Sequence, residues 1–151
     1  MSKACPHCGG IIVKGRSSAD HRRFFGVIRA AFDNWPDSHD FAPDSPEHLR
    51  CWLLCKAGYR EVRTFELPEA NPVMMARMME FAETLMEHAG DGHRFGRWRG
   101  NVLSVFKPKS IAWDKLGQRE FGAVRSAVED VIKAETGLDP DKLLKEAEAA
   151  A

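Results

Sequence analysis

The stretch HRFGRWRGNVLSVF, residues 93–106, decides the fold class of this 151-residue chain. Apolar and polar residues alternate on both sides of the tripeptide RGN at 99–101, which is the pattern of a β-hairpin with a glycine-containing turn. Residues 59–67 are rich in β-branched and aromatic side chains and predict another strand. Residues 11–13 are apolar and β-branched and predict a short strand near the N-terminus.

Helical periodicity covers most of the remaining chain. Apolar residues recur every three or four positions in residues 19–34, in residues 71–89 and in the stretch before Gly137. Ser45-Pro46-Glu47 has the cap, proline and acid that begin a helix, here expected to reach Ala57. We therefore predict an α+β fold with about four helices packed with a small antiparallel sheet in a single domain. The methionines of residues 71–89 are expected to lie in the core.

Three segments are predicted along the chain: an N-terminal knuckle and loop at 1–18, an α+β core domain at 19–138, and an acidic C-terminal helix and tail at 139–151. Hydrophobic residues make up 44% and charged residues 29%, which is typical of a globular protein and excludes collagen or a disordered tail. No apolar run approaches the roughly 20 residues of a membrane span, and the first ten residues lack the apolar core of a signal peptide. We expect a soluble cytoplasmic protein.

Charge is balanced overall but distributed in blocks. Residues 1–30 carry a net charge of +5, residues 31–89 carry −6, residues 90–128 carry +5 and residues 129–151 carry −4. Such a pattern suits a protein with a basic face for nucleic acid and an acidic face elsewhere, provided that the two positive segments meet. It is equally consistent with charges that cluster on ordinary solvated surfaces.

The sequence CPHCGG, residues 5–10, is typical of a zinc knuckle, since glycines allow backbone N–H groups to turn toward the two sulfurs. One knuckle supplies two of the four ligands of a structural zinc ion. Cys51 and Cys55 are four residues apart on a predicted helix and form the candidate second pair. The alternative is that these two are core thiols, and His7, His21, His39 or His48 could then take their place as ligands. The predicted cofactor is structural zinc, with Cys5, Cys8, Cys51 and Cys55 as ligands.

Residues 93–109 combine five cations with interleaved aromatic rings and contain no acid. Cations neutralise phosphates and exposed rings stack on unpaired bases, so this composition indicates single-stranded nucleic acid as a partner. A second basic cluster begins the first predicted helix. The predicted nucleic-acid-binding residues are Arg16, Arg22, Arg23, Arg94, Arg97, Arg99, Lys107 and Lys109. The alternative places the rings in the core and the arginines on an ordinary surface, and for Trp98 we favour the core.

Catalytic motifs are missing from the sequence. It contains no nucleophile elbow, P-loop or dinucleotide fingerprint. Asp20 and His21 could contribute to a metal-dependent nuclease site, but no paired-carboxylate spacing singles them out. We predict a protein that is not an enzyme, with no catalytic residues.

Two segments resemble known phage proteins. RSSADHRRFFGVIRAAFDNW, residues 16–35, and KSIAWDKL, residues 109–116, followed by Glu120-Phe121, resemble the first helix and the C-terminal signature of a phage-encoded family of uncharacterised proteins. They are also faintly similar to the NinB family of lambda-type recombination mediators, whose second helix is similar to residues 45–52. The resemblance implies a phage or prophage origin, a bacterial host cytoplasm and a role in recombination or replication. It further implies binding of single-stranded DNA and of a host protein, by a homodimer.

Our preferred hypothesis is a non-enzymatic accessory protein of phage recombination or replication that binds single-stranded DNA through a basic face. The alternative is a phage-encoded inhibitor that binds a host nucleic-acid-handling or defence protein through its acidic surface, where carboxylates imitate phosphate. A metal-dependent nuclease ranks third. No membrane partner is expected.

Overall fold

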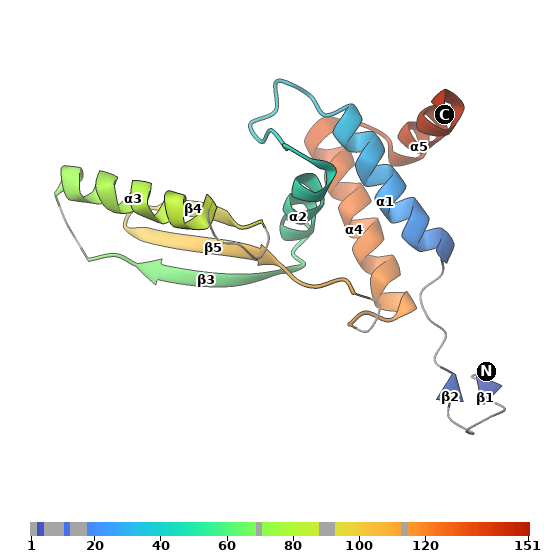
Figure 1. Ribbon diagram of the computed structural model, residues 1–151, viewed down its shortest axis with the longest axis horizontal. Coiled ribbons are helices and arrows are strands. Elements are labelled where there is room, and N and C mark those ends of the chain that lie inside the picture. The colour runs from blue at the N-terminus through green and yellow to red at the C-terminus, as the bar shows by residue number, and fades with distance from the viewer. Residues whose placement is uncertain (1–2, 5–10, 13–17, 69–70, 88–92, 113–114) are drawn as a thin grey trace.

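The computed structural model describes residues 3–4, 11–12, 18–68, 71–87, 93–112 and 115–151. These residues form a helical body and an arm that extends from it (Figure 1). The body contains α1 (Ser18–Asp33), α2 (Pro46–Lys56), α4 (Gln118–Thr136) and α5 (Pro140–Ala150), and the arm contains β3 (Arg60–Glu66), α3 (Pro72–Glu87), β4 (Phe95–Arg99) and β5 (Val102–Pro108). Near the N-terminus, β1 (Lys3–Ala4) pairs with β2 (Ile11–Ile12) in antiparallel fashion.

The predicted α+β class is confirmed, with an antiparallel three-stranded sheet in the order β3-β5-β4. The described residues form five helices instead of about four, and the fifth, α5, occupies the segment expected to be an acidic helix and tail. Asp139 caps this helix, since its side chain accepts a hydrogen bond from the backbone N–H of Lys142, and Pro140 begins it. Leu143 of α5 is buried against the rest of the body, so this segment contributes to the core.

The core of the body forms where the apolar stripes of α1, α2 and α4 meet. Phe24, Leu53, Phe121 and Ile132 are all at most 1% exposed. The rings of Phe24 and Phe121 meet edge to face with their centroids 5.3 Å apart. The helical periodicity of the sequence thus predicts the packed faces of α1 and α4, whereas α2 was predicted from the residues that begin it.

One end of α2 leads directly into the arm. The helix begins at the cap Ser45, whose hydroxyl accepts a hydrogen bond from the His48 backbone N–H at 3.1 Å. After Ala57, the chain turns at Gly58, which has φ +85°, a left-handed conformation that glycine adopts without strain. Strand β3 starts two residues later, so the orientation of the sheet depends on how α2 is packed in the body.

The arm is a hairpin, β4 and β5, with β3 added on the other side of β5. Strands β3 and β5 are paired from Arg60 opposite Pro108 to Glu66 opposite Val102. The predicted turn is confirmed, with Gly100 at φ +59° between β4 and β5. Helix α3 lies along one face of this sheet (Figure 1). It comes so close to β4 that a Cβ atom on Gly96 would lie 2.7 Å from the Met86 terminal methyl.

Aromatic side chains join the arm to the body. The Phe95 ring of β4 lies 6.0 Å from the ring of Phe41 and 5.6 Å from that of His48. Phe41 in turn stacks parallel to Trp52 of α2, with their centroids 4.6 Å apart. The base of the arm is therefore held by ring contacts, whereas its far end extends away from the body (Figure 1).

Candidate nucleic-acid interface

The pairing of the strands decides which side chains share a face of the sheet. Residues directly opposite each other in an antiparallel pair point to the same side. Glu61 lies opposite Lys107, and Arg63 lies opposite Val105. Phe65 lies opposite Leu103 in the next row on the same face. This is the face that α3 partly covers.

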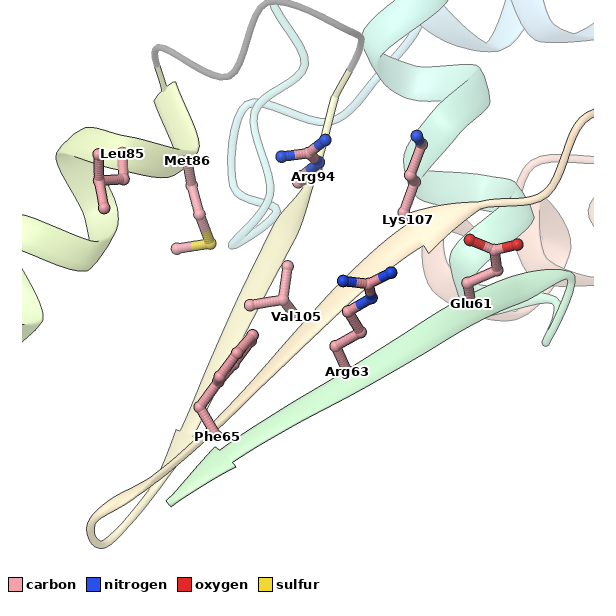
Figure 2. Close-up of a pocket in the computed structure, with 8 residues that line it drawn as sticks. All are labelled: Glu61, Arg63, Phe65, Leu85, Met86, Arg94, Val105 and Lys107. Atoms are coloured by element: carbon pink, nitrogen blue, oxygen red, sulfur yellow. The ribbon is translucent and has the colours of Figure 1, made fainter. Parts of the chain in front are cut away.

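A cavity of about 440 Å³ opens between this face and the end of α3. We call it the basic pocket, and it is lined by Glu61, Arg63, Phe65, Leu85, Met86, Arg94, Val105 and Lys107. Figure 2 shows its charged side chains gathered over the strands near the base of the arm, with Phe65, Met86 and Leu85 toward the other end. The pocket thus has a polar end and an apolar end.

Positive charge dominates the polar end of the basic pocket. Arg63, Arg94 and Lys107 converge there from three different strands or their flanks, against the single carboxylate of Glu61. Glu61 is directly opposite Lys107 across the β3–β5 pair, an arrangement in which opposite charges attract. Arg63 and Arg94 line the same space, so the lining of the basic pocket carries three cations and one carboxylate.

The other face of the sheet carries the remaining arginines of the hairpin. Arg97 and Arg99 alternate on β4 opposite Ser104 and Val102, and both arginines are exposed. Val62, 49% exposed, lies on this face as well, two residues from the exposed Thr64. We call this surface the open face, because α3 lies on the opposite side of the sheet.

Two further cations at the base of the arm have structural contacts. The Arg60 guanidinium lies 4.5 Å from the centre of the Phe106 ring and donates a hydrogen bond to the Cys55 carbonyl at 3.0 Å. The ammonium group of Lys109 lies 5.8 Å from the centre of the Tyr59 ring. Both are cation–π contacts within the base of the arm, and the hydrogen bond from Arg60 to Cys55 connects the start of the sheet to α2.

The structure separates the predicted nucleic-acid-binding residues into distinct places. Arg94 and Lys107 line the basic pocket, whereas Arg97 and Arg99 lie on the open face. Lys109 is at the base of the arm, Arg22 and Arg23 are on α1 in the body, and Arg16 lies outside the described residues. Because α1 packs in the body while the sheet extends away from it, the cations of α1 and of the hairpin do not form one continuous surface (Figure 1).

Arg23 has a structural role instead. Its guanidinium forms ion pairs with Glu129 of α4 at 2.9 Å and with Asp141 of α5 at 2.8 Å. These hydrogen bonds raise the pKa of Arg23 above its ordinary value, and the same contact lowers the pKa of Asp141. Arg23 therefore ties three helices of the body together, and its charge is already balanced by carboxylates of the protein.

Sequence reasoning missed Arg63 and Phe65. Both lie on a strand that the sequence predicts, but in the block of residues with a net charge of −6, which hides one arginine among many acids. Their position beside Lys107 follows only from the register, since Arg63 and its partner Val105 are far apart in sequence. The available signal was the spacing of Glu61, Arg63 and Phe65 at alternate positions, which places their side chains on one face of a strand.

The predicted zinc ligands are only partly described. Cys5 and Cys8 lie outside the described residues, and Cys51 and Cys55 are buried free thiols of α2. Burial raises the pKa of each thiol to about 11. Within the described ranges, no three His, Cys, Asp or Glu side chains gather as a metal site requires. The described pair could offer two sulfur ligands and no third, so the zinc site stays a prediction that depends on Cys5 and Cys8.

Two expectations about hydrophobic residues have different outcomes. Trp98 is partly buried, and its indole N–H is enclosed without a hydrogen-bond partner among the described residues. The methionines were expected in the core, but Met74 is 53% exposed. Helix α3 covers one face of a narrow sheet, and no layer formed by the described residues covers its outer side, so its other apolar face is exposed (Figure 1).

Comparisons with known proteins give no match: no family model, curated protein or solved structure matches this chain. The resemblance of residues 16–35 and 109–116 to phage proteins therefore stays a prediction.

The helices of the described residues were also compared with what a lipid bilayer requires. None of them combines the length and the apolar character that crossing a membrane would demand.

Proposed function

We propose that this protein is a non-enzymatic accessory protein of phage recombination or replication that binds single-stranded DNA through its arm. The observation that carries this proposal is the three-stranded sheet with cations on both faces: Arg97 and Arg99 on the open face, and Arg63, Arg94 and Lys107 in the basic pocket. Such contacts neutralise phosphates without reading sequence. The phage setting and the cytoplasm of a bacterial host follow from the resemblance of residues 16–35 and 109–116.

The geometry favours the arm over the body as the DNA-binding part. The arm extends from the body, so a flexible strand can reach the open face directly and the other face beside the end of α3, away from the helices of the body (Figure 1). In the body, by contrast, Arg23 is paired with Glu129 and Asp141. Compared with the sequence-based prediction, the proposed interface leaves out Arg16, Arg22, Arg23 and Lys109 and gains Arg63.

Fluorescence anisotropy with a labelled oligonucleotide, measured over a series of salt concentrations, tests the proposal. The double variant Arg97→Glu/Arg99→Glu should weaken binding by about tenfold or more and reduce the salt dependence. The matched control is Arg29→Glu/Arg119→Glu, which makes the same change of charge at two exposed positions of the body. Wild-type protein that does not bind at low salt, or two double variants with equal affinity, would overturn the proposal.

A second candidate function is supported by the outer side of α3. Val73, Met74 and Phe81 are between 53% and 69% exposed, and such a concentration of apolar side chains typically marks a protein interface. Glu80 and Glu83 are exposed on the same helix. Exposed apolar and acidic side chains on one helix fit the alternative function, in which the protein inhibits a host nucleic-acid-handling or defence protein. They also fit a homodimer.

Pull-down from host lysate with Phe81→Asp as the negative control distinguishes this candidate from DNA binding. The inhibitor is favoured if the wild type captures a stoichiometric partner, Phe81→Asp does not, and the wild type has no affinity for DNA. Light scattering of the purified protein tests the homodimer, since a mass of one chain at all concentrations would exclude it.

We also propose that Cys5 and Cys8 bind structural zinc together with Cys51 and Cys55. The support is the CPHCGG sequence and the position of the second pair, four residues apart on one helix. Elemental analysis of protein purified without chelator should find about one zinc ion per chain. The double variant Cys5→Ser/Cys8→Ser should lose it, and a fully folded wild-type protein without metal would refute the site.

A further inference from the structure

We propose that the basic pocket holds one unpaired nucleotide, with its phosphate against Arg63 and Arg94 and its base stacked on the ring of Phe65. This inference rests on the proposed function and makes it more specific, because it assigns the recognition of single strands to one site. It concerns Phe65 and Arg63, which the sequence did not identify, and it gives the two ends of the pocket different roles.

The first step is the arrangement along β3. Arg63 and Phe65 are two residues apart and point to the same side of the strand, so their Cα atoms are about 7 Å apart at the rise of an extended chain. A phosphate and the base of the same nucleotide are separated by a similar length. One cation and one exposed ring therefore stand at the spacing that a single nucleotide needs.

The second step is the chemistry of the two ends. A purely cationic site would suit free phosphate, but the basic pocket continues past Arg63 to Phe65, Met86 and Leu85 (Figure 2). Phe65 is 51% exposed and Leu85 is 55% exposed, so both are accessible to a ligand. A ligand that satisfies both ends has an anionic part and a flat apolar part, as a nucleotide has.

The third step places the phosphate within the polar end. Glu61 lies directly opposite Lys107 and repels an anion at that position. The side chain of Arg63 lies farther from the base of the arm than Glu61 does, and Arg94, at the start of β4, lies between Glu61 and the end of α3 (Figure 2). A phosphate held there avoids the carboxylate, and its base extends toward Phe65. Arg63 is the best-defined cation for this role, because its side chain is exposed on β3.

The fourth step concerns size. The cavity of about 440 Å³ is within the usual range for small-ligand sites, roughly 300 to 1,000 Å³, and it is roofed on one side by the end of α3. A base inside a duplex is stacked and paired, so it cannot present its face to Phe65. The pocket accordingly accepts only an unpaired nucleotide, whereas the open face attracts phosphates of either single or double strands.

Fluorescence anisotropy with three labelled probes tests the inference: oligo-dT, an abasic strand of the same length and a duplex. Stacking on one ring predicts that the wild type binds oligo-dT about five- to 150-fold more tightly than the abasic strand. Phe65→Ala should bring the two affinities together and leave binding to the abasic strand unchanged. Phe65→Trp should keep the preference, because a larger ring stacks at least as well.

The matched control is Phe81→Ala, which removes an exposed ring from the same arm outside the basic pocket and should leave the preference intact. Arg63→Gln should weaken binding to oligo-dT and to the abasic strand equally and lower the salt slope by about 0.7. Equal wild-type affinity for oligo-dT and the abasic strand, or a preference that survives in Phe65→Ala, would overturn the inference while the proposed function stands. A wild type that binds none of the three probes would overturn both.

Discussion

The helical body and the arm use hydrophobic residues in opposite ways. In the body, the large apolar side chains of α1, α2 and α4 are almost completely buried. In the arm, Leu103 is buried, but Val62, Phe65, Phe81 and Leu85 are between 49% and 65% exposed. Burial of apolar surface is the main source of stability, so the body supplies most of it. The arm instead presents rings and cations to solvent, which is what a binding surface requires.

The largest predicted effect on stability comes from replacing a phenylalanine with alanine in each of the two parts. Phe121→Ala removes a ring that is 0% exposed, and it should lower the free energy of unfolding by about 3 to 5 kcal/mol. Phe81→Ala removes a ring that is 65% exposed, and it should change that free energy by less than about 0.5 kcal/mol. Urea denaturation followed by circular dichroism measures both. Similar losses in the two variants would show that the outer side of α3 is buried in solution.

The contrast between body and arm also explains what the sequence could predict. The helices and the hairpin follow local rules of periodicity, capping and glycine turns, and they were predicted to within a few residues. The site could not be predicted in the same way, because Arg63 joins Lys107 only through a register between strands distant in sequence. The exposure of Met74 was missed for a related reason. An apolar stripe predicts a buried face only where another layer covers it, and the sequence does not reveal that layer.

A medium effect is expected at Arg23, where the body uses a cation for structure. Arg23→Met keeps the aliphatic stem but removes the ion pairs to Glu129 and Asp141, and it should cost about 1 to 2 kcal/mol of stability. The loss is limited because Arg125 still donates to Glu129 at 3.2 Å. The neighbouring exposed Arg22 provides the control, since Arg22→Met should change stability by less than about 0.5 kcal/mol.

A second pair of variants, Arg23→Met in the body and Arg63→Gln in the arm, tests the functional side of the comparison. The charge of Arg23 is already balanced by two carboxylates. Arg23→Met should therefore leave the affinity for oligo-dT unchanged, whereas Arg63→Gln in the arm should weaken it. Anisotropy at low salt measures the affinities, at a temperature where both variants are folded. If Arg23→Met weakened binding as much as Arg63→Gln, α1 would belong to the DNA-binding surface and the division between body and arm would be wrong.

The smallest effect is expected at the junction of the two parts. Burial lowers the pKa of His48, and this effect is larger than the opposing effect of the Asp44 carboxylate, which lies 3.1 Å away and raises the pKa. The His48 ring also stacks on the His93 ring, with their centroids 4.5 Å apart. The unfolded chain therefore takes up a proton at this site at a higher pH than the folded protein does. Stability should fall as the pH drops below about 6.5, the ordinary pKa of histidine, and the loss should be complete below the lowered pKa.

Replacing the ring isolates this contribution. His48→Phe keeps the aromatic contacts with Phe41 and Phe95 but cannot be protonated, so its stability should depend less on pH between 7 and 5 than that of the wild type. Denaturation at a series of pH values measures the difference. Hydrogen exchange then shows which elements lose stability in acid. Because His48 contacts Phe95 of β4, acid should increase amide exchange in β4 and β5 before it does so in α1 and α4. Acceleration in all helices at once would show that the arm and the body unfold as one unit.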